Sequence, residues 1–313
     1  MAHDASKLPN SAPAADASVR RLRNTEWPKE EVQRLAESSG KPLEVICAQQ
    51  FLSARWKARL GSYFTEGELK TLRELDVLAE KEEPLPEWQG AICRVRVLVS
   101  CRGFPPERSP MSYSVSTNCV PGFTPRLLSS YRAARPGAVS ERFGALPNLE
   151  QAGATELLRA TSLDTARPLV AFDMLEVNEV TKQKGRDHFD TTVEYKRCKD
   201  GDRQLFTATD SCVKAAFCWT QQDYQYPASF FTLNVPVCVI CKPFWDVCID
   251  DGEVSEPEVR QRGYQTNLYP SHPRPQEAMA LVWTVDEMAQ LVVALDSLFA
   301  WFHDELKNPD SAK

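Results

Sequence analysis

The chain has 313 residues, of which 42% are hydrophobic and 26% are charged, and its formal net charge is -6 at pH 7. This composition is typical of a globular protein and excludes a disordered or fibrous chain. The negative charge gives no general attraction to phosphate, so contact with nucleic acid would require a local basic groove. No segment approaches the ~20 apolar residues of a membrane-spanning helix, and no basic leader precedes an apolar run, so we expect neither a membrane partner nor export.

The cysteines indicate the cell compartment in which the protein is expected, and the amino-terminal composition indicates where its folded domain begins. Ten cysteines lie scattered in apolar runs rather than in a small loop-rich framework. Such cysteines are typical of reduced core thiols, so the sequence predicts a cytoplasmic protein. Residues 1–19 are rich in Ala, Ser, Asp and Pro without apolar periodicity, which predicts a flexible tail. We expect one elaborated domain over residues 20–313.

Two helices and three strands are predicted over the first third of the chain. Pro28 and Gly40 bound a short amphipathic helix. A second helix begins at Pro42, and one almost wholly apolar face predicts that it packs on the core. That face consists of Leu43, Ile46, Cys47, Gln50, Phe51 and Ala54. Alternation of apolar and polar residues predicts strands over 56–64, 72–80 and 92–103.

The middle of the chain has weaker patterns. Residues 104–126 are rich in Pro, Ser and Gly, which predicts a loop. Residues 127–165 are predicted to be helical. Two strands over 168–177 and 188–198 are then predicted, with a tight turn from Lys199 to Asp202 after the second, and they indicate a hairpin or a small meander.

The last third alternates helix and buried strand. A helix is expected over 208–222, followed at 235–243 by a continuously apolar run typical of a strand buried on both faces. Residues 244–249 are predicted to form its neighbour, and residues 278–284 another strand. Thr284 and Glu287 have the spacing of a capping box that opens the final helix. The apolar stripe of that helix consists of Met288, Leu291, Val292, Leu295, Leu298, Phe299 and Phe302.

Asp76 is the first candidate for chemistry. It lies between apolar residues in the strand Arg-Glu-Leu-Asp-Val-Leu-Ala, where an unpaired charge is costly and therefore usually has a purpose. The alternative is a rim residue that alternation turns toward solvent. Metal-dependent phosphodiesterases need converging carboxylates that hold a hard cation and activate water.

The order of these elements resembles the PD-(D/E)xK nuclease superfamily, particularly its restriction-endonuclease-like and Holliday-junction-resolvase-like branches. That family carries a Glu on the first helix, an Asp on the second strand and Glu-x-Lys on the third. By position Glu44 matches the helix acid and Asp76 the strand acid, while Ser100 and Arg102 fall where the second carboxylate and the Lys belong. The resemblance implies an α/β, restriction-endonuclease-like mixed central sheet flanked by helices, with inserted loops and an extra hairpin.

The two departures predict a weakened or inactive enzyme. Ser100 is a neutral ligand that cannot replace a carboxylate around Mg²⁺, and Arg102 can hold phosphate but cannot exchange a proton at physiological pH. The leading hypothesis is therefore a pseudo-nuclease that handles nucleic acid or acts in anti-phage defence, with DNA as a partner. One alternative is an active Mg²⁺-dependent deoxyribonuclease in which Asp76 and a relocated ligand, Glu74 or Glu80, hold the metal. The other is a non-catalytic interaction subunit that binds protein partners or a second copy of itself.

Other residues suggest weaker candidates. Asp173 and the later Glu194-Tyr195-Lys196 repeat the acid then Glu-x-Lys order, although a solvent-facing strand edge explains them as well. Cys238 and Cys241 lie in an apolar strand, where core packing is favoured over zinc. His188 lies in a polar segment that predicts a solvated turn.

Basic residues alternate along the predicted strands. Arg55, Lys57, Arg94 and Arg96 are candidates to line a groove for phosphates, together with Arg59. A solvated sheet face is the alternative interpretation.

Overall fold

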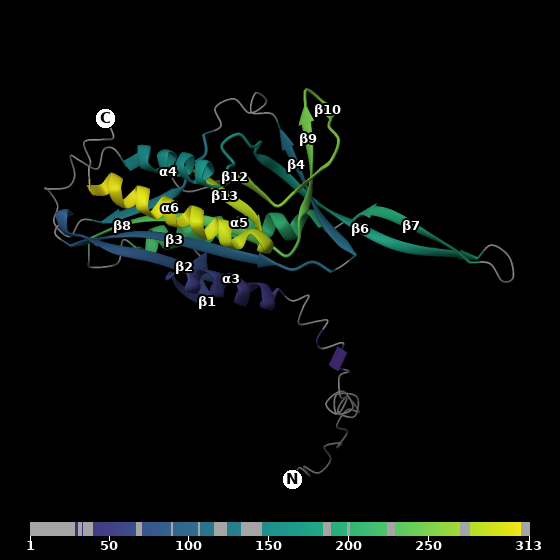
Figure 1. Cartoon of the computed structure of the whole chain (residues 1–313), viewed down its shortest axis with the longest axis horizontal. Helices are drawn as coiled ribbons and strands as arrows, with labels where there is room; N and C mark the ends of the chain where they lie inside the picture. Colours follow the sequence, from purple (N-terminus) through teal and green to yellow (C-terminus); the bar gives the residue numbers. More distant parts are fainter. Residues whose placement is uncertain are drawn as a thin grey trace, which may run out of the picture.

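The computed structural model describes residues 29–30, 33, 40–66, 71–88, 90–105, 107–115, 124–132, 146–183, 189–198, 201–223, 229–269 and 276–307. The predicted tail over 1–19 lies outside this part of the chain. The expected helix between Pro28 and Gly40 also falls largely outside it, although residues 29, 30 and 33 are helical. Figure 1 shows a large mixed sheet flanked by helices, so the chain is an α/β protein.

The sheet follows the order β1-β2-β3-β8-β13-β12-β6-β4-β9-β10, with β5 beside β8, β7 beside β6 and β11 beside β9. In chain order the strands are β1 (Lys57–Glu66), β2 (Thr71–Leu85), β3 (Ala91–Arg102), β4 (Arg108–Val115), β5 (Leu128–Arg132), β6 (Leu169–Gln183), β7 (Phe189–Arg197), β8 (Phe230–Ile240), β9 (Phe244–Asp250), β10 (Glu253–Val254), β11 (Glu258–Arg260), β12 (Arg262–Tyr269) and β13 (Gln276–Thr284).

The three predicted strands of the first third are confirmed as β1, β2 and β3, which pair antiparallel in sequence order. The helix that precedes them, α3 (Lys41–Ser53), buries Leu43, Cys47 and Phe51 of the expected face, whereas Gln50 and Ala54 are half-buried and Ile46 is exposed. Because α3 and the long β2 and β3 come from one continuous segment, their ends are brought together without any distant pairing.

β8 is the centre of the sheet, and all of its residues are buried. It lies parallel to both β3 and β13, which explains its continuously apolar sequence. Pro236 is unexpected in a central strand because it lacks an N–H. On the side away from β3, β5 pairs only up to Asn234 and β13 only from Val237, so Pro236 falls in the gap between them.

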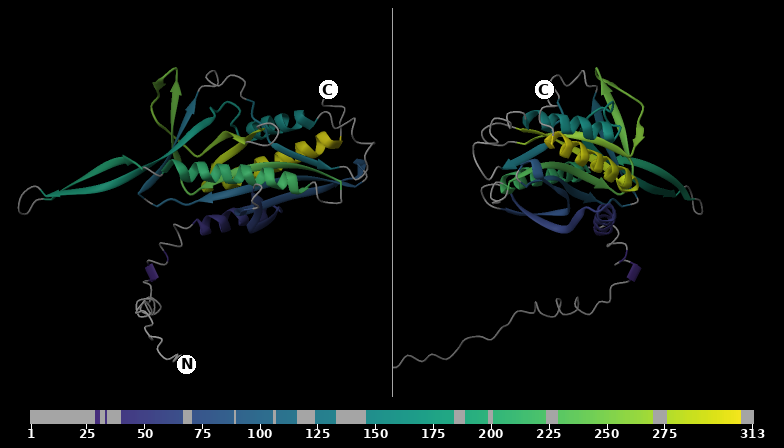
Figure 2. Two further views of the ribbon diagram at one scale, coloured as in Figure 1. Left: turned by 180° about the vertical axis from the view of Figure 1, so that it is seen from behind. Right: turned by 60° about the vertical axis from the view of Figure 1, so that its left-hand side comes forward.

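Helices cover both faces of the sheet. On one face α3, α4 (Leu146–Ala160) and α6 (Met288–Lys307) share a core with the strands, and on the other α5 (Gly201–Asp223) packs against β3, β6 and β8. Figure 1 shows α4 and α6 in front of the sheet, and the left view of Figure 2 shows α5 on the opposite side. The predicted apolar stripe of α6 is confirmed, since each of its seven residues is buried. None of the helices in the described ranges is long and apolar enough to cross a membrane.

A second part of the sheet adjoins β12. Its connection is the single parallel pair Gln265–Leu169 between β12 and β6. The predicted hairpin is confirmed as β6 and β7, which pair antiparallel and extend away from the rest of the sheet in Figure 1. β4 and β9 complete this part, with β10 and β11 at its edge.

Several predictions for the middle and the end of the chain are wrong. The predicted loop over 104–126 contains β4, and β5 lies in the segment predicted to be helical. Residues 244–249 do form a strand, β9, but it pairs with β4, β10 and β11 rather than with β8. The capping box is absent: Thr284 makes no side-chain cap hydrogen bond, and the Trp283 indole N–H donates to the backbone oxygen of Glu287.

Candidate functional site

The helix and strand positions singled out in the sequence do converge. Glu44 lies in the first turn of α3, Asp76 on β2, and Ser100 and Arg102 at the end of β3. The antiparallel register of β2 and β3 pairs Val77 with Val99, which places Asp76 beside Ser100. We call these four residues the α3–β3 site.

Asp76 is the acceptor at the middle of this site. Its Oδ2 accepts hydrogen bonds from the Ser100 hydroxyl at 3.2 Å, from the Cys101 backbone N–H at 2.6 Å and from the Arg102 guanidinium at 3.3 Å. The Asp76 side chain is 16% exposed, so the ion pair with Arg102 is partly shielded from water. The carboxylate is therefore neutralised by a side chain of the protein itself.

Glu44 is held separately by a lysine. The Lys41 ammonium lies 3.0 Å from Glu44 and 3.5 Å from Glu74, so it bridges two acids. Burial raises the pKa of Glu44, and the charges of Asp76 and Glu74 act in the same direction, while the Lys41 hydrogen bond opposes them. The same hydrogen bond with Glu44 raises the pKa of Lys41. Both carboxylates of the α3–β3 site thus have cationic partners already.

This arrangement does not fit a magnesium centre. Mg²⁺ needs several oxygen ligands in near-octahedral geometry, whereas Ser100 donates to Asp76 and Arg102 carries a fixed positive charge beside it. Among the residues that the structure describes, no group of three or more His, Cys, Asp or Glu could hold a metal ion. Glu80, one of the two acids considered as a relocated ligand, does not suit that role either, because Arg59 and Arg96 bind its carboxylate.

Two thiols lie directly beneath the site, and the sequence patterns did not single out this contact. The Sγ atoms of Cys47 on α3 and Cys101 on β3 are 3.8 Å apart and both residues are buried. The hydrogen bond with Cys47 raises the pKa of Cys101 well above its usual value, and burial adds to the effect. The two sulfur atoms lie where α3 packs against β3.

The predicted basic groove is corrected by the structure. Arg96 is 1% exposed, and its guanidinium binds both carboxylate oxygens of Asp223, at 2.9 and 3.0 Å, and Glu80 at 2.8 Å. It cannot contact phosphate. Arg94 is ion-paired with Glu82, and so is the more exposed Lys57. Arg55 is exposed and lies at the turn between α3 and β1 with a positive φ of 66°.

The second acidic constellation does not converge. Asp173 is fully buried on β6, where Arg197 forms an ion pair with it, while Glu194 on β7 pairs with Lys196. Glu194 lies opposite Asn178, five residues along the strand from Asp173, a separation of roughly 16 Å at about 3.3 Å per residue.

The Cys-x-x-Cys pair is divided between two environments. Cys238 is buried in β8, and burial raises its pKa to about 12, which disfavours the thiolate that zinc requires. Cys241 follows the strand, and its sulfur accepts a hydrogen bond from the Phe104 N–H at 3.1 Å. His188, which was predicted to lie in a solvated turn, falls outside the described residues.

No protein-family model matches the chain, and neither a curated protein nor a solved structure matches it.

Proposed function

We propose that the chain is a pseudo-nuclease: a protein with a restriction-endonuclease-like core that acts by binding nucleic acid, in nucleic-acid handling or anti-phage defence, without cleaving it. Support for the core comes from the succession of α3, the antiparallel strands β1 to β3, the later helix α5, and β8 parallel to β3. These elements support the proposal because the resemblance implies a mixed central sheet flanked by helices.

The observation that carries the proposal is the ion pair between Asp76 and Arg102. In a metal-dependent site the strand carboxylate must leave its lone pairs to a cation, yet here Asp76 accepts three protein hydrogen bonds on one oxygen. Arg102 supplies the positive charge that a metal ion would supply. Unlike a metal ion, however, a guanidinium does not coordinate a water molecule and activate it for attack. Exposed donors of Arg102, which is 31% exposed, remain available for a phosphate oxygen.

The decisive experiment measures cleavage of plasmid and single-stranded DNA with Mg²⁺ or Mn²⁺ by three proteins. These are the unaltered chain, Asp76→Ala, and the double variant Ser100→Glu with Arg102→Lys, which restores the acid and lysine of the family pattern. We expect no metal-dependent cleavage by the first two. Cleavage by the unaltered chain that Asp76→Ala abolishes would overturn the proposal and establish an active nuclease with a relocated ligand.

Metal titration by calorimetry shows whether the chain has lost the ability to bind a metal ion or has lost only the ability to cleave DNA. The unaltered chain should bind neither Mg²⁺ nor Mn²⁺ at millimolar concentration, while the double variant should bind Mn²⁺ with a release of heat that Asp76→Ala removes. Arg102→Lys alone is the matched control, because it keeps the charge and adds no ligand. Saturable binding of Mg²⁺ or Mn²⁺ by the unaltered chain would show that a metal ion displaces Arg102 from Asp76.

A second candidate, a non-catalytic interaction subunit, is favoured by the internal pairing of Arg94 and Arg96. Binding of a fluorescent DNA duplex at several salt concentrations distinguishes it from the pseudo-nuclease. Phosphate contacts release counterions, so affinity should fall steeply as salt rises if the chain binds DNA. Arg102→Gln should then weaken binding of the duplex. An absence of any salt-dependent binding would favour the interaction subunit over the pseudo-nuclease.

A further inference from the structure

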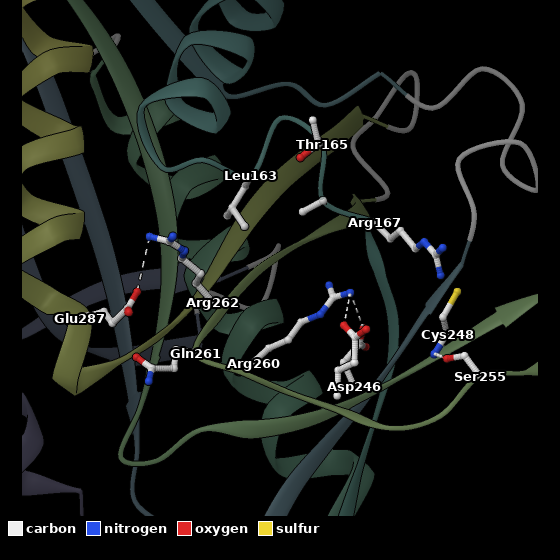
Figure 3. A pocket seen from close by; sticks show the side chains of 12 residues that line it. Leu163, Thr165, Arg167, Asp246, Cys248, Ser255, Arg260, Gln261, Arg262 and Glu287 are labelled. Atoms are coloured by element: carbon white, nitrogen blue, oxygen red, sulfur yellow. Dashed lines mark hydrogen bonds and ion pairs between the residues drawn. The ribbon is translucent and has the colours of Figure 1, made fainter.

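A cavity of about 560 Å³ lies away from the α3–β3 site, between the segment that precedes β6 and the strands β9, β11 and β12 (Figure 3). Three arginines line it: Arg167 before β6, Arg260 at the end of β11 and Arg262 at the start of β12. Its volume lies within the range of small-molecule sites, roughly 300–1,000 Å³. We call it the arginine pocket.

Arg260 is held in place by a buried carboxylate. Asp246 on β9 is 2% exposed and accepts hydrogen bonds from the hydroxyls of Ser112 and Ser114 on β4, at 2.7 and 2.8 Å. Its Oδ2 also lies 2.9 Å from the Arg260 guanidinium. Because several donors fix Asp246, the arginine is oriented before any ligand arrives, and its other N–H groups remain for a ligand.

Arg262 is fixed in a different way. One of its guanidinium nitrogens lies 3.0 Å from the side-chain oxygen of Gln290 and 3.5 Å from Glu287. The guanidinium also lies over the Trp283 ring, 5.5 Å from its centroid. Figure 3 shows Arg262 beside Glu287 and Arg260 beside Asp246, on neighbouring parts of the wall.

Arg167 completes the set, and it also lines an adjoining pocket together with Asp250, Asp251 and Glu253. It is exposed, and within the described ranges its side chain has no hydrogen-bond or ion-pair partner. The formal charges of the acids and bases that line the pocket cancel, so long-range attraction is weak and an anion must be recognised by direct hydrogen bonds. A guanidinium with all five donors free is suited to that task.

We propose that the arginine pocket binds a small molecule through a phosphate group, which Arg167 contacts directly while Arg260 and Arg262 supply further donors. Phosphate fits better than carboxylate because its oxygens can accept from several guanidinium groups at once. Leu163 and Ala166, which also line the pocket, offer apolar surface to the remainder of the ligand. This site is independent of the proposed pseudo-nuclease function.

The two sites nevertheless share one edge of the sheet. β3, β8 and β13 are parallel, and their carboxyl ends carry Arg102, Ile240 and Thr284 in adjacent register. Arg262 pairs with Trp283 at the same edge, three strand spacings from β3, or roughly 14 Å. Ligands in α/β sheets commonly bind outside the carboxyl ends of such strands.

Isothermal titration calorimetry with inorganic phosphate and with adenosine monophosphate tests the proposal on the full chain. We expect saturable binding of both, and Arg167→Gln should weaken it by roughly tenfold or more, the range for hydrogen bonds to charged groups. Thr165→Glu, at an exposed position that lines the pocket, should abolish binding through repulsion. Acetate at the same concentrations should bind at least several-fold more weakly than phosphate.

The matched control is Arg159→Gln, which removes an exposed arginine on α4 that pairs with Glu156 outside the pocket. It should bind phosphate like the unaltered chain. Circular dichroism and melting curves of the variants establish that they fold. An absence of saturable phosphate binding, or equal affinity in Arg167→Gln and Arg159→Gln, would overturn the proposal whatever the cleavage assays give.

Discussion

Arg96 illustrates how a single buried charge organises the surrounding strands. It extends from β3 to Asp223 at the end of α5 and to Glu80 on β2, and its guanidinium lies over the Trp219 ring, 4.8 Å from the centroid. Burial opposes its charge, but the hydrogen bonds and charges of Asp223 and Glu80 outweigh burial and raise the pKa of Arg96. The arginine is thus a structural residue rather than a phosphate ligand.

Arg96→Met should destabilise the protein by about 3–5 kcal/mol, because it removes the closest ionic partner of the buried Asp223 and both of its hydrogen bonds from that guanidinium. Urea unfolding followed by circular dichroism measures the loss. Arg59→Gln is the control, since Arg59 pairs with Glu80 while 62% exposed and should contribute about 0–1 kcal/mol. Equal losses in the two variants would show that Asp223 is satisfied without Arg96.

Glu44 gives the α3–β3 site a pH dependence of defined sign. Because the folded state raises the pKa of Glu44, it favours the protonated form, and this contribution to stability is lost as pH rises through the folded pKa. Glu44→Gln should therefore be more stable than the unaltered chain at pH 7. The difference in stability should become smaller when the pH falls below about 4.3, the pKa of glutamate in model peptides. Thermal unfolding at pH 7 and pH 4 provides the comparison, and a larger difference at pH 4 would contradict it.

The structure brings Asp76 together with Ser100 and Arg102 but buries Arg96 away from any groove, and one physical reason accounts for both outcomes. Alternation places a side chain on one face of a strand but does not say what covers that face. The face with Arg94 and Arg96 is covered by α5, whose Asp223 is more than 120 residues away in the chain. The residues of the α3–β3 site could be expected to lie together because its helix and strands are consecutive in the chain, while the role of the site stays a prediction.

At the scale of elements, continuous apolar patterns predicted the parts that lie in the middle of the sheet. β3, β8 and α6 each carry enough apolar surface to define their structure locally. β4 and β5 escaped prediction because they are short and contain serines. Their strand conformation depends on partners elsewhere: the buried Ser112 and Ser114 of β4 are satisfied by Asp246 of β9, which no local pattern encodes.

The contact between β12 and β6 depends on the absence of a side chain at Gly263. A Cβ there would lie 2.8 Å from Leu169 Cδ1, and Leu169 is 1% exposed, so it has little room to move. Gly263→Ala should cost about 1–3 kcal/mol through overpacking.

A double-mutant cycle with Leu169→Ala tests this origin of the cost. In the Leu169→Ala background the added methyl group should be neutral or favourable, giving a coupling of about 1 kcal/mol or more between the two positions. Additive losses in urea unfolding would show that contact with Leu169 is not the origin of the cost.

At the scale of the whole molecule, the sheet has two parts of different construction. The part that contains β1, β2, β3, β8 and β13 is covered by helices on both faces. The part formed by β4, β6, β7 and β9 joins the sheet through one residue pair between β12 and β6, and it packs on the first part through α5 and a shared apolar cluster. The arginine pocket lies where these parts meet, and the α3–β3 site lies wholly within the first. The chain therefore separates its two candidate sites along one sheet edge.

The central position of β8 has a consequence for how the protein is made. During synthesis, the second edge of β3 stays unpaired until β8, about 140 residues later in the chain, has been made. At ribosomal rates of about 5–20 residues per second this delay is roughly 7–28 s, during which a long apolar strand edge stays open. We expect newly synthesised chains to depend on chaperones in this interval, and faster translation of the intervening segment to raise the soluble yield.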